Sequence, residues 1–349
     1  MYKETLFGLI NGVSVYLFKL ENTKGTEVKI TNYGARIVAI LTHDQFGDKG
    51  DIILGYDTLA DYQNDKHYLG AVVGPCPGRL SENKFTLEGV EYLLEKNTPS
   101  GHLHGGSKGF SFAIWEVLEY SDNRLTLRHQ HRHLDSGYPG NINVELTYAL
   151  DNQNVLSMKS KVFSDRRAIF NITYHPYFNL KGQGDILDNT LTIHGEKVVD
   201  MGIDWSPSGH LLSVEDTPFD FRTAKKIGKD IESSHQMIKL TSGYDQAWIV
   251  GEKGNMKTVA SISEPSSGRV LNLRSDMPAL VFYTGNFLHG IRGKQNTEYK
   301  KHTGFCMEPQ QYPDAANQKN FPSVIIEPNR IYESETQYCF SLEKKFRCF

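Results

Sequence analysis

The chain lacks the features that mark several classes of protein. Its 349 residues carry a net charge of only −3, without the basic excess that draws proteins to nucleic acid. No apolar run approaches the length needed to cross a bilayer, so we expect neither a nucleic-acid nor a membrane partner. The N-terminal residues lack a basic start followed by an apolar core, which predicts that the protein stays in the cytoplasm.

Cysteine is scarce, and the few cysteines form no pattern. Four are scattered along the chain without any C-x-x-C pair: Cys76, Cys306, Cys339 and Cys348. Four cysteines in a chain of this size do not make a disulfide framework, so we expect reduced thiols. Cys306 lies two residues before Glu308 and would share its strand face, which predicts a buried thiol close to any site there.

Long amphipathic runs with a helical period are also nearly absent. Instead, short alternating or apolar runs are bounded by Gly, Pro, Asn or Asp, which is typical of β-strands and turns. These runs cover residues 28–30, 37–41, 51–54, 125–129, 143–150, 155–162, 246–250 and 279–283. Many short strands at close spacing predict an all-β sandwich or barrel.

A few further elements complete the predicted fold. Short helices are expected at residues 57–62 and 225–231, and hairpin turns at residues 83–84, 151–152, 182–183 and 254–255. We find no repeat of fixed period and no Pro- or Ser-rich linker. The sequence therefore predicts one continuous domain over residues 1–349.

Two widely separated residues have the chemistry for moving protons near neutral pH. His175 stands among Tyr174, Tyr177 and Asn179, a mixture of rings and hydrogen-bond partners that can line a sugar pocket. A buried structural histidine explains the same segment equally well. Glu308 follows an apolar run, so burial would raise the pKa of its carboxyl group towards the range of a general base. A structural ion pair is the commoner fate of such a glutamate.

Other candidates have plain alternatives. His102 and His104 have a spacing that suits a metal, but no third or fourth ligand follows at a recognisable distance; the glycines at 105 and 106 would let the backbone approach a ligand. Residues 129, 131 and 133 are histidines on one face of a predicted strand, where a solvated face or the rim of a site is favoured over a zinc site. Asp245 follows a glycine by two residues, which is typical of a turn, whereas a buried aspartate there could hold hydroxyl groups.

Ten motifs, in this order, resemble the aldose 1-epimerase (galactose mutarotase) family along nearly the whole chain. They are TNYGA (31–35), DIILGYD (51–57), LHGG (103–106), GYPGN (137–141), HPYFNL (175–180), TPFDFR (217–222), GYD (243–245), YTGNF (283–287), GFCME (304–308) and PDAAN (313–317). The resemblance implies a large twisted antiparallel β-sandwich, the supersandwich of galactose mutarotase, with a few short helices.

The resemblance also implies a reaction on a free monosaccharide. His175 matches the general acid that protonates the ring oxygen, and Glu308 matches the general base that takes the proton of the anomeric hydroxyl. The ring opens, the C1–C2 bond rotates, and closure on the other face gives the opposite anomer. On the sequence we expect a nearby Glu308 to raise the pKa of His175 and to keep its imidazole charged.

The remaining site residues follow in the same way. His104 matches a second catalytic histidine near the reacting end of the sugar. Asp245 and Arg79 match residues that hold and orient the substrate, and Tyr177 and Tyr174 are expected beside it. The family's reaction needs no cofactor and no metal, and we expect a monomer or a homodimer.

The chain departs from the family's pattern around the sugar. Pro75 and Gly78 stand where the family commonly has Arg and Asn, Val281 replaces a glutamine, and Tyr174 replaces a frequent asparagine. The acid and base remain, while part of the sugar-reading shell has changed. Two alternatives stay open: an epimerase for a modified or phosphorylated sugar, and a carbohydrate-binding protein without turnover.

Overall fold

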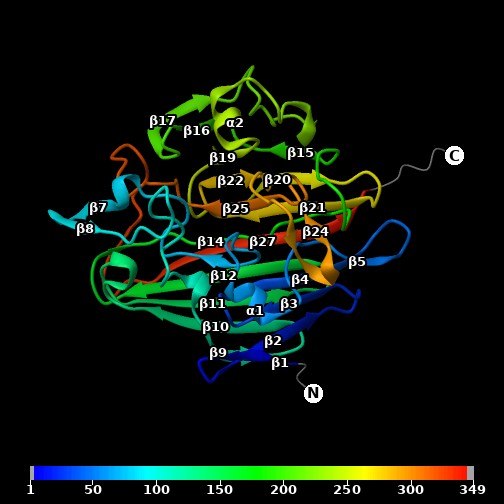
Figure 1. Cartoon of the computed structure of the whole chain (residues 1–349), viewed down its shortest axis with the longest axis horizontal. Helices are drawn as coiled ribbons and strands as arrows, with labels where there is room; N and C mark the ends of the chain where they lie inside the picture. Colours follow the sequence, from blue (N-terminus) through cyan, green and yellow to red (C-terminus); the bar gives the residue numbers. More distant parts are fainter. Residues whose placement is uncertain (1–3, 344–349) are drawn as a thin grey trace.

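Strands dominate the computed structural model, which describes residues 4–343; Cys348 lies outside them. Figure 1 shows the strands stacked in layers. The largest sheet has nine strands, in the order β18 (Lys225–Lys226), β15 (Thr190–Ile193), β20 (Lys257–Ser263), β21 (Arg269–Ser275), β27 (Tyr332–Leu342), β12 (Val155–Ser164), β11 (Ile142–Leu150), β10 (Arg124–His131) and β9 (Glu116–Tyr120).

Two five-stranded sheets accompany it. One runs β1 (Glu4–Ile10), β2 (Val13–Glu21), β3 (Glu27–Thr31), β4 (Ile37–His43) and β5 (Lys49–Asp51), low in Figure 1. The other, higher in the view, runs β17 (Pro207–Ser213), β16 (Lys197–Met201), β19 (Asp245–Ile249), β22 (Ala279–Tyr283) and β25 (Cys306–Gln310). Neighbouring strands pair antiparallel, as in β11 with β12 and β22 with β25.

Four two-stranded ribbons and two short helices join these sheets. The ribbons are β6 (Val72–Val73) with β14 (Thr173–Tyr174), β7 (Lys84–Leu87) with β8 (Val90–Leu93), β13 (Ala168–Ile169) with β26 (Ile325–Ile326), and β23 (Ile291–Arg292) with β24 (Glu298–Tyr299). The helices are α1 (Leu59–Gln63) and α2 (Gln236–Thr241). No helix among the described residues has the length and apolar character needed to span a membrane.

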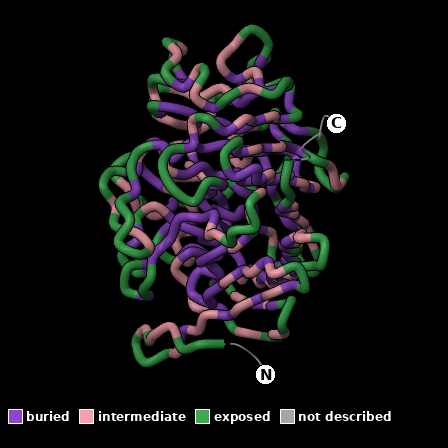
Figure 2. Tube along the Cα trace, turned by 90° about the vertical axis from the view of Figure 1, so that its right-hand side faces the viewer, coloured by how far each residue is buried: buried purple, intermediate pink, exposed green. Residues whose placement is uncertain are grey.

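One hydrophobic core connects the three large sheets. Ile30 of β3, Leu146 of β11 and Phe282 of β22 belong to the same buried cluster. Figure 2 shows buried segments running through the middle of the molecule, with exposed segments at its outer loops. Burying this much apolar surface is the main favourable contribution to folding. The three large sheets therefore share one core.

The alternating pattern in the sequence predicts the central strands well. Buried and less buried residues alternate along all of β11, and its turn to β12 lies at residues 151–152, as expected. The other three predicted hairpins are wrong. Residues 254–255, for example, connect β19 to β20, which lie in different sheets. Turn residues predict that the chain reverses, but the partner of each strand is decided by long-range packing.

One predicted helix is confirmed and one is wrong. Helix α1 begins after Thr58, whose side chain caps it by accepting a hydrogen bond of 3.2 Å from the backbone N–H of Asp61. Residues 225–231 do not form the predicted helix. Lys225 of β18 pairs with Leu191 of β15, and a three-residue 3₁₀ turn follows at Ile227–Lys229. Pairing with the edge of the nine-stranded sheet overrides the local helical preference.

The histidines of β10 also differ from expectation. His131 is fully buried, His129 is partly buried, and only His133, beyond the strand, is exposed. The buried pair continues the apolar face of Leu125 and Leu127 and packs against the rings of the segment 110–115. The prediction of a solvated strand face is therefore wrong, because this face of β10 points into the core.

Candidate active site

Six of the seven predicted site residues meet in one cavity of about 400 Å³ over the sheet that contains β19, β22 and β25. Strands far apart in sequence supply them, since an antiparallel sheet brings distant segments side by side. The predicted residues that line it are Arg79, His104, His175, Tyr177, Asp245 and Glu308.

Glu308 occupies the centre of β25, whose five residues are all buried. Its side chain faces the cavity, directly across from Val281 on β22. Only 3% of the residue is exposed. Burial raises the pKa of the Glu308 carboxyl well above its ordinary value, and the negative charge of Asp245 raises it further.

His175 comes directly after β14 and lies at the other edge of β25. Its backbone N–H donates to the carbonyl of Ala71 at 2.9 Å, and its carbonyl accepts from the N–H of Gly70 at 3.0 Å. Its Nε2 lies 3.5 Å from Oε1 of Glu308, and its Nδ1 lies 3.5 Å from Sγ of Cys306. The ring is therefore held between a carboxyl group and a thiol, with only 5% of the residue exposed.

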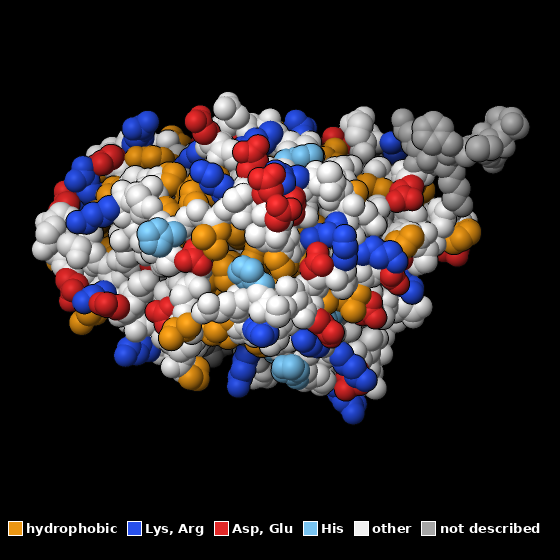
Figure 3. Space-filling view, turned by 90° about the horizontal axis from the view of Figure 1, so that it is seen from above, with side chains coloured by type: hydrophobic (Ala, Val, Ile, Leu, Met, Phe, Trp, Pro, Cys, Tyr) orange, Lys and Arg blue, Asp and Glu red, His pale blue; other side chains and the backbone are white. Residues whose placement is uncertain are grey.

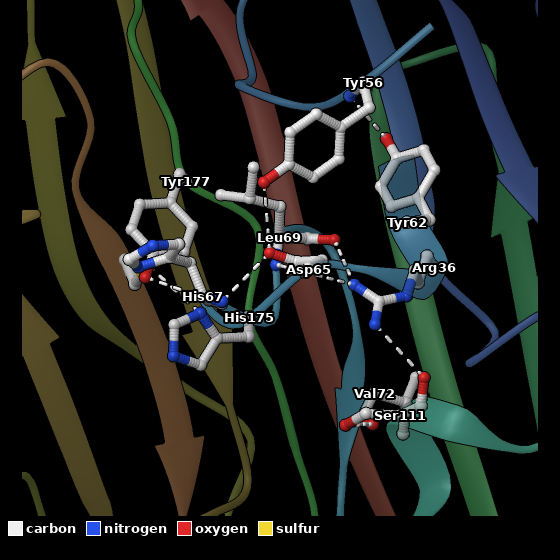
Figure 4. A network of polar contacts seen from close by, with 11 residues as sticks. Arg36, Tyr56, Tyr62, Asp65, His67, Leu69, Val72, Ser111, His175 and Tyr177 are labelled. Atoms are coloured by element: carbon white, nitrogen blue, oxygen red, sulfur yellow. Dashed lines mark hydrogen bonds and ion pairs between the residues drawn. The ribbon is translucent and has the colours of Figure 1, made fainter. Parts of the chain in front are cut away.

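A buried ion pair supports the segment beside His175 (Figure 4). Arg36 Nη1 donates to Asp65 Oδ2 at 2.8 Å, and both side chains are shielded from solvent. The same carboxylate accepts from the backbone N–H groups of His67 and Leu69 at 2.9 and 2.8 Å. Because its charge is matched and hydrogen-bonded on several sides, the pair can fix this loop in place. Nothing in the sequence near His175 indicated it.

His104 lies beside His175 in a left-handed backbone conformation, with φ of 54°. Its Nδ1 accepts a hydrogen bond of 3.0 Å from the backbone N–H of Gly78, so in the neutral ring the proton is on Nε2. Burial, and then the neighbouring His175 and Arg79, lower the pKa of His104 well below its usual range. The ring packs edge-on against His175, with 5.5 Å between centroids. His104 is therefore a neutral group that donates through Nε2.

Arg79 and Asp245 bring opposite charges to the cavity. The guanidinium carbon of Arg79 lies 4.9 Å from the centre of the Trp205 ring, a cation–π contact that orients it. Asp245 begins β19, opposite Tyr283 on β22. Burial raises the pKa of Asp245 to about 6, against the opposing effect of Arg79. Asp245 is thus a strand residue, and the alternative of a simple turn aspartate is excluded.

The two tyrosines beside His175 lie in different surroundings. Tyr177 lines the cavity with its ring, while its hydroxyl donates to the carbonyl of His67 at 3.0 Å. Tyr174 does not line the cavity; it pairs with Val72 and belongs to the main core. Successive strand residues point to opposite faces, so His175 and Tyr174 could not both face the site. The prediction that Tyr174 contacts the substrate is therefore wrong.

The expected charge on His175 is wrong for this geometry. Burial lowers the pKa of His175 to about 4, whereas it raises the pKa of Glu308. Both shifts favour the uncharged pair, with the proton on Glu308, because two charges this deeply buried lose their hydration. The uncharged pair and the imidazolium–carboxylate pair contain the same number of protons. They differ only in where one proton lies.

Two histidine groups bear on the question of metal binding. His102 uses Nδ1 with the carbonyl of Glu95 and Nε2 with the hydroxyl of Tyr138, both at 2.7 Å, so neither nitrogen is left for a metal shared with His104. His175, Cys306 and Glu308 place ligand atoms within 4.8 Å of one another. The two nitrogens of His175 face different partners, however, so one ion would have to displace an existing contact. This arrangement suits proton transfer better than ligation.

Sequence reasoning missed several residues of the cavity wall. They come from connecting segments or carry no chemical signal of their own, and they include Val199, Met201, Trp205, Ala247, Phe287 and Pro313. Trp205 lies in the β16–β17 connection and packs on Phe287, with 5.3 Å between ring centroids. The replacement of the family's glutamine by Val281 could have indicated one such residue, since Val281 lines the cavity.

Comparison with known proteins agrees with this geometry. The chain matches the model of the aldose 1-epimerase family over residues 16–339. It is 34% identical to a galactose mutarotase of Rattus norvegicus over 343 residues, which cover 97% of this chain and 98% of that protein. It is 29% identical to an aldose 1-epimerase of Escherichia coli (strain K12) over 347 residues, 98% of this chain and all of that protein.

Solved structures share the fold. An aldose epimerase homologue from C. elegans matches with a TM-score of 0.89 at 25% identity, over 94% of this chain and 99% of that one. A galactose 1-epimerase from Lactobacillus acidophilus matches with a TM-score of 0.86 at 26% identity, over 99% of both chains. The chain belongs to the aldose 1-epimerase family, a family of isomerases, and the twisted β-sandwich expected from the sequence is confirmed.

Proposed function

We propose that the protein interconverts the α and β anomers of a free aldose, with His175 as the acid and Glu308 as the base. The observation that carries this proposal is the 3.5 Å between Nε2 and Oε1 in one buried cavity. The ring oxygen and the anomeric oxygen of a sugar are bonded to the same carbon. Two proton-transfer groups at this separation can therefore reach both oxygens at once.

The proton balance of the reaction fits the pair. In the reactive form, His175 is protonated and Glu308 is ionised. His175 gives its proton to the ring oxygen, Glu308 takes the proton of the anomeric hydroxyl, and the C1–O5 bond breaks to leave the open-chain aldehyde. The pair is now uncharged, the form that burial favours. After rotation about C1–C2, the same transfers in reverse close the ring on the other face.

Cys306 defines which nitrogen of His175 takes part. Burial raises the pKa of the thiol well above its ordinary value, so it remains protonated, and its Sγ accepts a weak hydrogen bond from Nδ1–H of the neutral ring. The proton that His175 exchanges is then the one on Nε2, which faces Glu308. Cys306 is a positioning residue and needs no redox chemistry.

The other polar groups bind and orient the sugar. His104 donates to it through Nε2, Asp245 accepts from its hydroxyl groups, and Arg79 donates to it from its place on Trp205. Tyr177 presents only its ring, because its hydroxyl is already engaged. We also propose a cytoplasmic location, and a monomer or homodimer, from the sequence features described above.

The charges of the cavity argue against a phosphorylated sugar. Two basic side chains line it, Lys66 and Arg79, against the three carboxyl groups of Asp200, Asp245 and Glu308. A phosphate site would present clustered cations instead. On the face shown in Figure 3, too, acidic and basic side chains are interspersed. The pairing of acid and base likewise argues against a protein that only binds sugar.

Polarimetry tests the proposal directly. Fresh α-glucose and α-galactose are each mixed with catalytic amounts of protein, and the decay of optical rotation is followed against the spontaneous rate. An anomerase accelerates the decay without changing its endpoint. A binding protein changes the endpoint in proportion to its own concentration and leaves the rate constant unaltered, and that result would overturn the proposal.

A further inference from the structure

An apolar row extends across the sheet from Glu308. Val281 on β22 lies directly opposite Glu308, and Ala247 on β19 lies directly opposite Val281. Val199, on the next strand β16, lines the same cavity. None of these three side chains can hydrogen-bond to a sugar. The cavity thus has a polar region around the acid–base pair and an apolar region beside it.

The position of His175 decides which part of the sugar meets this row. The segment that carries His175 runs along the edge of β25 away from β22: Thr173 Oγ1 donates to the carbonyl of Pro309 at 3.0 Å, and Phe178 bridges to Phe305. Glu308 therefore lies between His175 on one side and Val281 on the other.

This order orients the substrate. C1 of an aldose ring is bonded to the ring oxygen, the anomeric oxygen and C2. With the anomeric oxygen at Glu308 and the ring oxygen at His175, C2 is directed away from His175, towards Val281. The hydroxyl group at C2 is therefore the one that meets the apolar row. This step rests on the acid and base assigned under the proposed function.

The wall at Gly78 offers this hydroxyl no partner either. Gly78 lines the cavity without a side chain, and a Cβ added there would meet nothing nearer than Pro313, at 4.0 Å. Its backbone groups are already used by His104: the N–H donates to Nδ1 at 3.0 Å, and the carbonyl accepts from the His104 N–H at 3.0 Å. The departures from the family at Gly78 and Val281 thus both remove polar groups from the cavity.

From this arrangement we infer that the protein favours 2-deoxyaldoses, sugars that carry a methylene group at C2. A hydroxyl against Val281 gives up hydrogen bonds to water and gains none from Val281, Ala247 or Val199, whereas a methylene group loses nothing on an apolar wall. An apolar pocket rejects an added hydroxyl only moderately, by at most about 100-fold. We expect a preference of about tenfold in kcat/KM, so the hydroxylated sugars remain substrates.

The test compares 2-deoxyglucose with glucose and 2-deoxygalactose with galactose by polarimetry. Each kcat/KM is divided by the spontaneous rate constant of the same sugar, because the sugars differ in intrinsic reactivity. The expected ratio is about ten in favour of each 2-deoxy sugar. A ratio of one or below overturns the inference. If no sugar is accelerated, the proposed function itself fails, so the two failures are distinguishable.

Variants at Val281 locate the effect. Val281→Thr keeps the shape and adds a hydroxyl, and should bring the 2-deoxy preference close to one by improving the hydroxylated sugars up to about tenfold. Val281→Ala keeps the wall apolar and should retain the preference, which controls for general damage. The ratio of 6-deoxygalactose to galactose should not respond to Val281→Thr. If it changes as much as the 2-deoxy ratio, Val281 does not read C2 and the inference is wrong.

Discussion

Two pairs of histidines, each with one buried and one partly buried member, can be compared in this molecule, one at the candidate site and one in the core. His175 and His104 lie at the cavity, whereas His129 and His131 lie on the inner face of β10. Burial lowers the pKa of His175, His129 and His131 alike, to about 4. By burial and pKa alone, the pairs look the same.

Their partners differ. His175 touches Glu308 and Cys306, and His104 accepts from Gly78. Neither nitrogen of His131, nor Nε2 of His129, has a hydrogen-bond partner among the described residues. Aromatic rings surround the core pair instead. A perturbed pKa therefore does not identify a site by itself; a neighbour that can exchange a proton does.

The largest effect should come from removing either the acid or the base. Glu308→Gln keeps the size of the side chain but cannot take a proton, and His175→Asn cannot give one. Each should lower kcat by about 10²- to 10⁴-fold, the usual contribution of a positioned acid or base. Sugar binding, followed by isothermal titration calorimetry, should be largely retained. Full activity in either variant would refute the role assigned to that residue.

Asp245→Asn should act on binding. A carboxylate holds hydroxyl groups through charge-assisted hydrogen bonds, so its loss should raise KM by about 10- to 100-fold while kcat changes little. The same group predicts a pH dependence in the wild type. Because the pKa of Asp245 is about 6, the carboxylate is lost as the pH falls through 6, and KM should rise there. An unchanged KM in the variant, measured at pH 7, would contradict this role.

A smaller effect is expected at Cys306, which only directs the ring of His175. Cys306→Ala removes the hydrogen bond to Nδ1 and should lower kcat up to about tenfold, with KM unchanged. Cys306→Ser keeps an acceptor for Nδ1–H there and should recover part of the loss. The ¹⁵N chemical shifts of His175 give an independent check, since the alanine variant should show a mixture of neutral tautomers where the wild type shows one. Identical spectra would mean that Cys306 does not set the tautomer.

The smallest effect on turnover should come from the core pair. His131→Leu replaces two unpartnered nitrogens by an apolar group of similar size, so kcat should change by less than about twofold. Stability should become less sensitive to acid. The folded pKa of His131 lies below its unfolded value, so stability is lost as the pH falls from about 6.5 towards 4. Thermal unfolding of the variant across this range should show a weaker decline, and a large loss of kcat would remove the contrast between the pairs.

The sequence predicts the strands better than it predicts their partners. Alternation of apolar residues locates β11 and β12, because one face of each strand must be buried. The alternation does not show that β19 and β20 belong to different sheets, since that depends on packing between distant segments. The inward face of His129 and His131 was missed because histidine carries no clear preference for either side.

The site shows the same division. The ten motifs contain His175, Glu308, His104 and Asp245, the family resemblance adds Arg79, and all five line one cavity. Strand alternation turns Tyr174 away, which the resemblance alone did not show. The location of the shared proton could not be predicted either, because it depends on how deeply both groups are buried.

The most direct test of the shared proton is the pH profile of kcat, measured at saturating sugar and corrected for the spontaneous rate. The pair must hold one proton to work. Below about pH 4 the pair holds two protons, because His175 becomes protonated while Glu308 keeps its own proton, and Glu308 cannot accept another from the sugar. At high pH Glu308 ionises, the pair loses its proton, and His175 has none to give. We predict a bell-shaped profile whose alkaline limb moves to lower pH in Asp245→Asn, because Asp245 raises the pKa of Glu308. A profile with a single limb, as from one titrating group, would contradict the account.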